Sequence, residues 1–208
     1  MNLPLKAQVR ALIGPPSRVL ARSGVTANHL TFLGLALSLL AGFALAAGRY
    51  LPAALLMTVS GVCDMLDGAV ARAGGGESRL GAFLDSTLDR IGESAIYVGS
   101  AWRVAALAGA AGGAGAPWAL AASAAPALAL ATSLLVSYAR ARAEGLGAEC
   151  RVGLMERTER MVLLILGAGI AIRREDAWSA ALLLLAALNL ITLAQRVLHV
   201  ARALKRSS

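Results

Sequence analysis

Residues that build many soluble enzymes are scarce in this chain. It holds only two cysteines, Cys63 and Cys150, and two histidines, His29 and His199, among 208 residues. Two distant cysteines cannot form a disulfide framework or a zinc site. We read Cys63 as a core residue and the two separated histidines as packing or interface residues. The composition therefore excludes a disulfide scaffold and a Cys/His metal centre.

Charge is also scarce, at 15% of residues, whereas 58% are hydrophobic and the mean hydropathy is +0.68. Long apolar runs separated by short charged connectors are typical of an integral membrane protein and leave no room for a second, water-soluble domain. A net charge of +8 would suggest nucleic acid in a soluble protein. Here we attribute it to the cytoplasmic bias of Lys and Arg and to attraction for membrane lipids and phosphate-bearing substrates, and we expect no nucleic-acid partner.

The chain is predicted to form one all-α membrane domain over residues 1–208. Residues 3–22 alternate cations with aliphatic residues around Gly14-Pro15-Pro16, as in an amphipathic helix that lies in the membrane interface. Residues 29–199 follow as a bundle of six transmembrane helices. The six predicted spans are 29–48, 52–72, 81–103, 117–141, 155–173 and 177–199.

The distribution of cations predicts the orientation. An even number of spans places both termini on one side, and that side receives most of the Lys and Arg residues, so both termini are expected in the cytoplasm of a cell with an inner membrane. Aromatic residues at the opposite ends of the spans would form an interfacial belt. The predicted outer cations are Arg49, Arg103, Arg173 and Arg174, and the predicted belt is Tyr50, Trp102, Trp118 and Trp178.

Four aspartates lie in or next to these apolar segments. Asp64 and Asp67 are spaced i, i+3 and Asp85 and Asp89 are spaced i, i+4, so each pair shares one helix face. The glycine-rich stretch 73–78 predicts a turn that makes the two helices antiparallel, with their carboxylates facing one another. Two carboxylates ~5 Å apart repel by about 3 kcal/mol at an effective dielectric of ~20.

A divalent cation would offset this repulsion best, because carboxylate oxygens are the ligands that Mg²⁺ or Mn²⁺ prefers. The alternative is a structural salt-bridge cluster with Arg72, Arg79 and Arg90. Bound metal can neutralise a diphosphate, and a carboxylate that remains partly free can accept the proton of an attacking hydroxyl. A site at membrane depth on the cytoplasmic side favours a lipid substrate.

The acids belong to a longer pattern, D-x2-D-G-x2-A-R-x8-G-x3-D-x3-D. Every position of it is present, as Asp64, Asp67, Gly68, Ala71, Arg72, Gly81, Asp85 and Asp89. In this the chain resembles the CDP-alcohol phosphotransferase family, and the six predicted helices extend the resemblance over the whole chain. The resemblance implies a metal-dependent transfer of a phosphatidyl group from a CDP-linked lipid such as CDP-diacylglycerol to a hydroxyl, with CMP leaving.

The resemblance also implies roles for single residues. Asp64, Asp67 and Asp85 would bind metal, in a site for two ions, and Asp89 would be the general base and touch the second ion. The CDP-lipid would be held by Gly68, Arg72 and Ser78, and by Asn28 and Thr31 of the run VTANHLT. Taken alone, Asn28 followed by Thr31 reads as a helix N-cap. Family members are commonly homodimers, and we expect one here.

For the acceptor, the run SYARARAEGLGAECRVGLMERTER resembles the bacterial phosphatidylinositol-phosphate synthases, which accept inositol phosphate. The corresponding acceptor-phosphate residues here are Ser137, Arg140, Arg160 and Arg196. Arg140 stands where that group usually has a lysine. The neighbouring Arg142, Arg151 and Arg157 are read as positive-inside anchors.

Other functions stay open at this point. Glycerol 3-phosphate is a rival acceptor, because charge alone does not separate it from inositol phosphate, and an archaeal-type ether lipid is a rival donor. A free alcohol such as serine would leave the arginines without an anionic partner. A cation transporter would also use intramembrane acids, although we find no internal repeat. A purely structural membrane subunit would not need the eight-position pattern.

Overall fold

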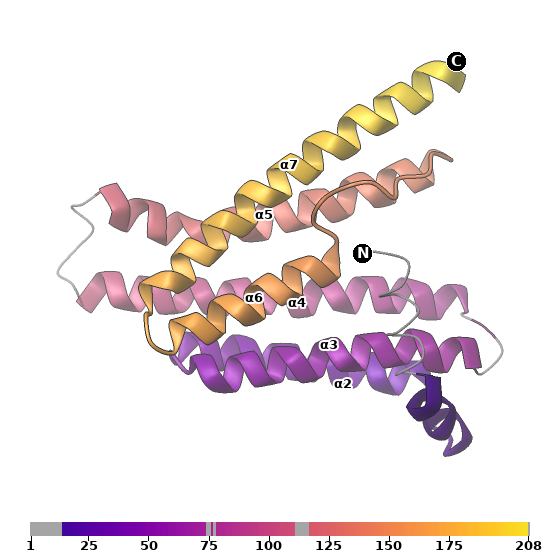
Figure 1. Cartoon of the computed structure of the whole chain (residues 1–208), viewed down its shortest axis with the longest axis horizontal. Coiled ribbons are helices and arrows are strands. Elements are labelled where there is room, and N and C mark those ends of the chain that lie inside the picture. Colours follow the sequence, from indigo (N-terminus) through magenta and orange to yellow (C-terminus); the bar gives the residue numbers. More distant parts are fainter. Residues whose placement is uncertain (1–13, 74–75, 77, 111–116, 208) are drawn as a thin grey trace.

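The computed structural model describes residues 14–73, 76, 78–110 and 117–207, and all regular structure in these ranges is helical. A helix at 14–22 precedes six longer ones, and each predicted span overlaps one of the six (Figure 1). α3 ends at Ala73 and α4 begins at Arg79, at the two limits of the turn predicted at 73–78. Residues 74, 75 and 77 of that turn lie outside the described part, as do residues 3–13. The helices are α2 Ala27–Ala46, α3 Tyr50–Ala73, α4 Arg79–Ala110, α5 Pro117–Gly145, α6 Arg157–Ala171 and α7 Asp176–Ser207.

Four of these helices are long and apolar enough to cross a membrane. The qualifying segments are Ala27–Ala46, Tyr50–Arg72, Ser123–Gly145 and Asp176–Lys205. By contrast, α6 has 15 residues, fewer than the ~20 that usually span the hydrocarbon core. The first turns of α4 carry the charged residues Asp85, Asp89, Arg90 and Glu93. These apolar helices and the apolar composition identify the chain as a multi-pass membrane protein.

The six helices contact one another in a closed order. α2 packs against both α3 and α4, α4 packs against α5, α5 against α7, α7 against α6, and α6 against α3. Consecutive helices α3 and α4 run antiparallel, as predicted (Figure 1), and in the order of contacts α2 lies between them. Side chains that point inward from α3, α4 and α6 therefore meet in one place.

The connections divide between two ends of the ring. The segments that join α3 to α4 and α5 to α6 lie at the same end as the helix at 14–22 and the C-terminus (Figure 1). The α2–α3 and α6–α7 connections lie at the opposite end. This alternation is the one that six consecutive spans predict, and it brings the acidic ends of α3 and α4 together.

Glycines allow α2 and α4 to cross in backbone contact. A Cβ atom at Gly99 would lie 2.0 Å from the backbone oxygen of Gly42, and one at Gly42 would lie 2.4 Å from the backbone oxygen of Ala95. Only hydrogen fits at these two positions. Small residues of this kind let helices approach closely and gain packing contacts in a membrane.

A polar cluster closes the end of the ring that is remote from the aspartates. The Tyr50 hydroxyl donates to Glu175 at 2.9 Å, and the same carboxylate oxygen accepts from Arg103 Nε at 2.6 Å. The hydrogen bond from Arg103 lowers the pKa of Glu175 below its usual range. Tyr50 also packs against Trp178, with ring centroids 6.0 Å apart.

The predicted aromatic belt is therefore wrong for two of its residues. Trp178 is 1% exposed and Tyr50 is 6% exposed, whereas Trp102 is 72% exposed, as a lipid-facing residue would be. Position along a span could not distinguish an aromatic residue that faces lipid from one that faces a neighbouring helix. The side chain of Trp118 lies outside the described part.

The glycine crossing gives a testable expectation. Gly99→Ala should destabilise the protein by about 1–3 kcal/mol, the usual cost of forcing extra volume into a packed contact. Equilibrium unfolding in mixed micelles measures this. Gly169→Ala is the matched control, because a Cβ atom at Gly169 would have no neighbour within 4 Å. Equal stability of the two variants would show that the α2–α4 contact does not need glycine.

Candidate active site

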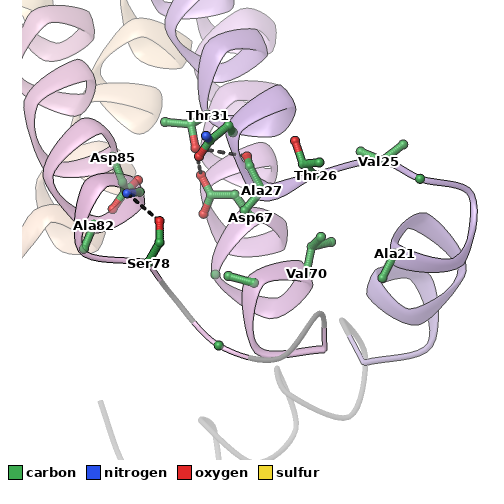
Figure 2. Close-up of a pocket in the computed structure, with 16 residues that line it drawn as sticks. Ala21, Val25, Thr26, Ala27, Thr31, Asp67, Val70, Ser78, Ala82 and Asp85 are labelled. Atoms are coloured by element: carbon green, nitrogen blue, oxygen red, sulfur yellow. Dashed lines mark hydrogen bonds between the residues drawn. The ribbon is translucent and has the colours of Figure 1, made fainter.

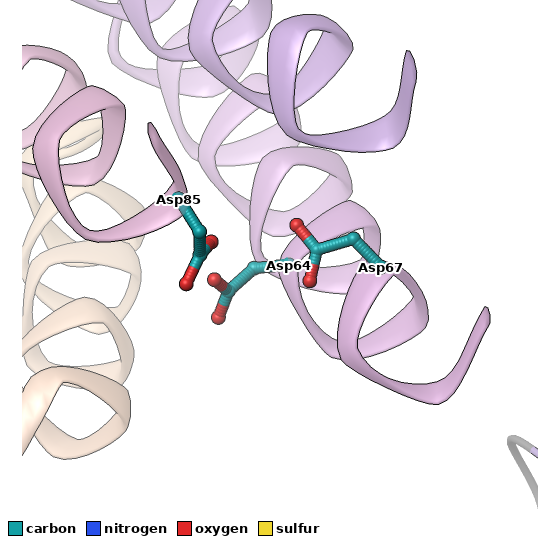
Figure 3. A group of neighbouring side chains, drawn as sticks. All are labelled: Asp64, Asp67 and Asp85. Atoms are coloured by element: carbon teal, nitrogen blue, oxygen red, sulfur yellow. The ribbon is translucent and has the colours of Figure 1, made fainter. Parts of the chain in front are cut away.

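Three carboxylates converge inside the acidic end of the ring. Asp64 and Asp67 come from α3 and Asp85 comes from α4, and one oxygen of each lies within 4.8 Å of the others (Figure 3). Asp67 is buried, and its Oδ2 accepts a hydrogen bond from the Thr31 hydroxyl of α2 at 3.0 Å. The helix that lies between α3 and α4 thus also orients one of the three acids.

These residues fit a divalent cation. The site consists of carboxylate oxygens that approach from two sides, at separations where like charges repel strongly. No Cys or His belongs to the group, so its chemistry suits Mg²⁺ or Mn²⁺ rather than a thiolate- or imidazole-bound metal. The predicted set of Asp64, Asp67 and Asp85 is thus brought together by the fold.

The fourth aspartate lies one turn further along α4 and has a different partner. Asp89 Oδ1 is 2.6 Å from Nη2 of Arg157, at the start of α6. The other terminal nitrogen of Arg157 donates to Asp64. Arg157, on α6, thus bridges α3 and α4. Our reading of it as a membrane anchor is wrong. Its spacing of i, i+3 from Arg160, which puts both on one face, was the available signal.

A cavity of about 360 Å³ opens beside the carboxylates. The helix at 14–22, the start of α2, the last turns of α3 and the start of α4 surround it (Figure 2). Asp67 and Asp85 line it together with four of the five predicted donor residues, which are Asn28, Thr31, Gly68 and Ser78. The fifth, Arg72, does not line this cavity, and its side chain lies beside Gly68 one turn earlier in α3.

Two helix caps shape this cavity. Thr26, not Asn28, is the N-cap of α2, in a capping box with His29. The alternative reading of Asn28 as a cap is therefore wrong. His29 is exposed, so it is not a packing residue, while its reading as an interface residue stays a prediction. Ser78 Oγ accepts a hydrogen bond from the backbone N–H of Gly81 at 2.9 Å and so begins α4. Ser78 accordingly has a structural role in addition to its place in the cavity wall.

A second, smaller cavity of about 60 Å³ lies on the other side of Asp89. All four predicted acceptor residues line it, which are Ser137, Arg140, Arg160 and Arg196. Arg196 is 3% exposed and donates to the backbone oxygens of Val136, at 2.6 Å, and Val152, at 3.0 Å. Arg140 is exposed and pairs with Glu144 at 2.8 Å. The acceptor residues thus come from α5, α6 and α7.

A third, narrow cavity of about 10 Å³ has lining residues in common with both, and we call it the connecting cavity. It shares Thr31 and Asp67 with the larger cavity and shares Asp89 and Arg157 with the smaller one. A large pocket, a group of carboxylates and an arginine-lined pocket therefore follow one another in series. This arrangement can hold two substrates on opposite sides of a charged centre.

One residue of the smaller cavity escaped the sequence analysis. Glu93 lines it, and both of its carboxylate oxygens accept hydrogen bonds from Arg160. It lies four residues after Asp89 and so continues the same helix face. That spacing was a usable signal, but Glu93 lies outside the eight-position pattern.

Known proteins match this chain closely. The family model described as CDP-alcohol phosphatidyltransferase matches residues 24–201. The archaetidylinositol phosphate synthase of Methanothermobacter thermautotrophicus is 38% identical over 201 residues, which are 95% of this chain and 92% of that protein. The phosphatidylinositol phosphate synthase of Mycolicibacterium smegmatis is 34% identical over 204 residues, 94% of this chain and 86% of that protein.

Solved structures agree. The crystal structure of Mycobacterium tuberculosis phosphatidylinositol phosphate synthase with CDP-DAG bound has a TM-score of 0.78 at 33% identity, over 91% of this chain and 94% of that one. The same synthase in complex with manganese and citrate has a TM-score of 0.77 at 34% identity, over 90% of this chain and 88% of that one. The match over nearly the whole length leads to one conclusion. The chain belongs to the CDP-alcohol phosphatidyltransferase family.

Proposed function

We propose that this protein transfers a phosphatidyl group from CDP-diacylglycerol to the hydroxyl of inositol phosphate and releases CMP. The observation that carries the proposal is the series of cavities, in which Asp89 lies between a large pocket and an arginine-lined pocket. A transfer between two bound substrates needs this order, because the attacking hydroxyl and the reacting phosphorus must be held close together.

The large cavity is the proposed donor site. Its small residues let a nucleotide approach the backbone, since Gly68 and Gly81 both line it. Asn28 and Ser78 offer polar groups near its opening, and Asp67 and Asp85 lie where a diphosphate held by metal would reach them. The crystal structure of the M. tuberculosis synthase, which matches 91% of this chain, has CDP-DAG bound. This supports the same donor here.

The smaller cavity is the proposed acceptor site. Arg140, Arg160 and Arg196 can each donate hydrogen bonds to a phosphate, and charge-assisted bonds of this kind are the strong ones. A phosphorylated polyol meets this requirement and a free alcohol does not. The relatives include a phosphatidylinositol phosphate synthase and an archaetidylinositol phosphate synthase. The products in these two names have inositol phosphate in common and differ in the lipid part.

Divalent metal is the proposed cofactor, as two Mg²⁺ or Mn²⁺ ions. Asp64, Asp67 and Asp85 would hold metal, and Asp89 would contribute to the second ion. When bound, the metal supplies positive charge to the diphosphate of the donor. The manganese complex of a solved relative supports this assignment.

Asp89 is the proposed general base. Its carboxylate lines both the connecting cavity and the acceptor cavity, so an acceptor hydroxyl that enters beside Arg160 comes within its reach. Arg157, which pairs with Asp89, would hold this carboxylate in position. Asp67 and Asp85 line the donor cavity and Asp64 lines the connecting cavity, but none of the three lines the acceptor cavity.

The membrane arrangement is also a proposal. We infer that α4 and α6 span the bilayer with the other four helices, because they close the ring and carry the site at its centre. The whole chain, 1–208, would form one domain with residues 3–22 as an interfacial amphipathic helix. Both termini and the site would face the cytoplasm of an inner membrane, and the protein would act as a homodimer.

The deciding experiment is an assay in detergent with labelled CDP-diacylglycerol and a panel of acceptors. Inositol phosphate should support CMP release and phospholipid formation. Glycerol 3-phosphate, free inositol and serine should support much less. Faster transfer to glycerol 3-phosphate would replace the proposed acceptor while keeping the reaction class. No CMP release with any acceptor would reject the transfer itself.

Replacing the proposed base should separate chemistry from binding. Asp89→Asn should lower kcat by roughly a hundredfold or more, as loss of a general base does, while binding of CDP-diacylglycerol changes little. Single-turnover transfer and donor binding measure the two effects. Asp176→Asn is the control, because that carboxylate lies at the opposite end of the ring and is 70% exposed. Turnover close to that of the unchanged protein would remove Asp89 from the chemistry.

Metal binding can be tested without turnover. Mn²⁺ should raise the melting temperature of the unchanged protein, because a ligand that binds only the folded state stabilises it. Asp85→Asn should abolish most of this increase, since it removes one of the three convergent carboxylates, while Asp176→Asn should keep it. EDTA should also stop transfer. An Mn²⁺ response that survives in Asp85→Asn, or transfer that persists in EDTA, would contradict the assignment.

A further inference from the structure

A buried hydrogen-bond network surrounds Glu93, on the wall of the acceptor cavity. Glu93 is 7% exposed, and Arg160 is 3% exposed. Glu93 Oε1 accepts from Arg160 Nε at 2.8 Å and from the Tyr97 hydroxyl at 2.9 Å, and Oε2 accepts from Arg160 Nη2 at 3.1 Å. The carboxylate thus holds one edge of the guanidinium group by two parallel hydrogen bonds.

The network continues through two more helices with a fixed direction. Tyr97 has one hydroxyl proton, which goes to Glu93, so at the 2.9 Å contact with Ser133 it is the Ser133 hydroxyl that donates. Ser133 Oγ in turn accepts from Asn189 Nδ2 at 2.9 Å. Every donor in this series of hydrogen bonds therefore points toward Glu93. Side chains from α7, α5 and α4 cooperate to fix one carboxylate.

This carboxylate determines which donors of Arg160 remain for a ligand. A guanidinium group has five N–H bonds in one plane. Glu93 accepts from the single N–H bond of Nε and from one of the two on Nη2. Both N–H bonds of Nη1 and the second of Nη2 therefore remain for a ligand. Arg160 lines the same cavity as Ser137, Arg140 and Arg196. By binding one edge of the Arg160 guanidinium group, Glu93 therefore fixes the position of the other edge. Arg160 lies in the wall of the cavity that the other predicted acceptor residues also line.

Stability alone is a poor explanation for this pair. Removing two charges from water costs several kcal/mol per ion, and apolar residues of similar volume often serve as well or better. A second ion pair, between Asp89 and Arg157, lies about one turn earlier on the same two helices. α4 and α6 are not among the helices in close packing contact, so these long side chains, not packed backbones, connect them.

We propose that Glu93 is a positioning residue for the acceptor, which orients Arg160 through its bidentate pair and thereby sets the preference for a phosphorylated alcohol. This inference rests on the proposed function of the same cavity. Glu93 does not touch the reacting atoms. Its loss should free Arg160 to rotate and so weaken binding of the acceptor phosphate, while the donor site on the far side of Asp89 is unaffected.

The test is a double-mutant cycle with Glu93→Gln and Arg160→Ala, using inositol phosphate as the probe. Glu93→Gln should raise the acceptor KM roughly ten- to a hundredfold, the range expected for losing a charge-assisted hydrogen bond. The KM for CDP-diacylglycerol should not change. In the Arg160→Ala background, Glu93→Gln should have little further effect on the acceptor KM, because the residue it positions is gone.

Tyr97→Phe provides a milder variant if Glu93→Gln does not fold. It removes one donor to Glu93 and leaves the bidentate pair, so the acceptor KM should rise severalfold with the donor KM unchanged. Equal increases in both KM values, or additive effects in the cycle, would indicate a merely structural role and overturn the proposal.

Binding of inositol phosphate, followed by its effect on the melting temperature, separates this proposal from the proposed function. If the unchanged protein transfers to inositol phosphate but neither Glu93→Gln nor Tyr97→Phe weakens its binding, only the role of Glu93 is overturned. If the unchanged protein neither binds nor uses inositol phosphate, the proposed function and the role of Glu93 both fail.

Discussion

Electrostatic repulsion among clustered carboxylates is the constraint on which this structure depends. One carboxylate oxygen of each of Asp64, Asp67 and Asp85 lies within 4.8 Å of the others, and Asp67 is buried, so the charges repel one another strongly. The fold holds them there through contacts outside the group. Thr31 of α2 hydrogen-bonds Asp67, and Arg157 of α6 pairs with both Asp64 and Asp89. A closed ring of helices makes this possible, because it directs side chains from several helices to one point.

The ring also separates two kinds of recognition. Small residues form much of the wall of the proposed donor cavity, as suits a flat nucleotide that must approach the backbone closely. Arginines form the acceptor cavity, and two of them are constrained, Arg160 by Glu93 and Arg196 by the backbone oxygens of Val136 and Val152. Arg140, in contrast, is exposed and pairs with Glu144. The proposed acceptor cavity thus combines two buried cations with one that is exposed.

Much of this was accessible from the sequence because it depends on local spacing. Asp64 to Asp89 are placed by helix periodicity and one turn, and the helical segments follow from apolar runs of sufficient length. What could not be predicted depends on which helices become neighbours. Nothing local reveals that α2 lies between α3 and α4 or that Trp178 packs inward on Tyr50. The spacing of Arg157 from Arg160 gives the helix face of Arg157 but does not identify the aspartates as its partners. Likewise, Asn28 and Thr26 are both acceptable caps by residue type, and only the backbone geometry selects Thr26.

The contact between Gly42 and Gly99 has a consequence for the distant carboxylates. Because α2 packs against both helices that carry the acids, the closeness of its crossing with α4 influences the separation of Asp64 and Asp85. Gly99 lies about 21 Å along α4 from Asp85, at 1.5 Å per residue. Two missing methyl groups at one end of the bundle therefore help to set the spacing of the carboxylates at the other end.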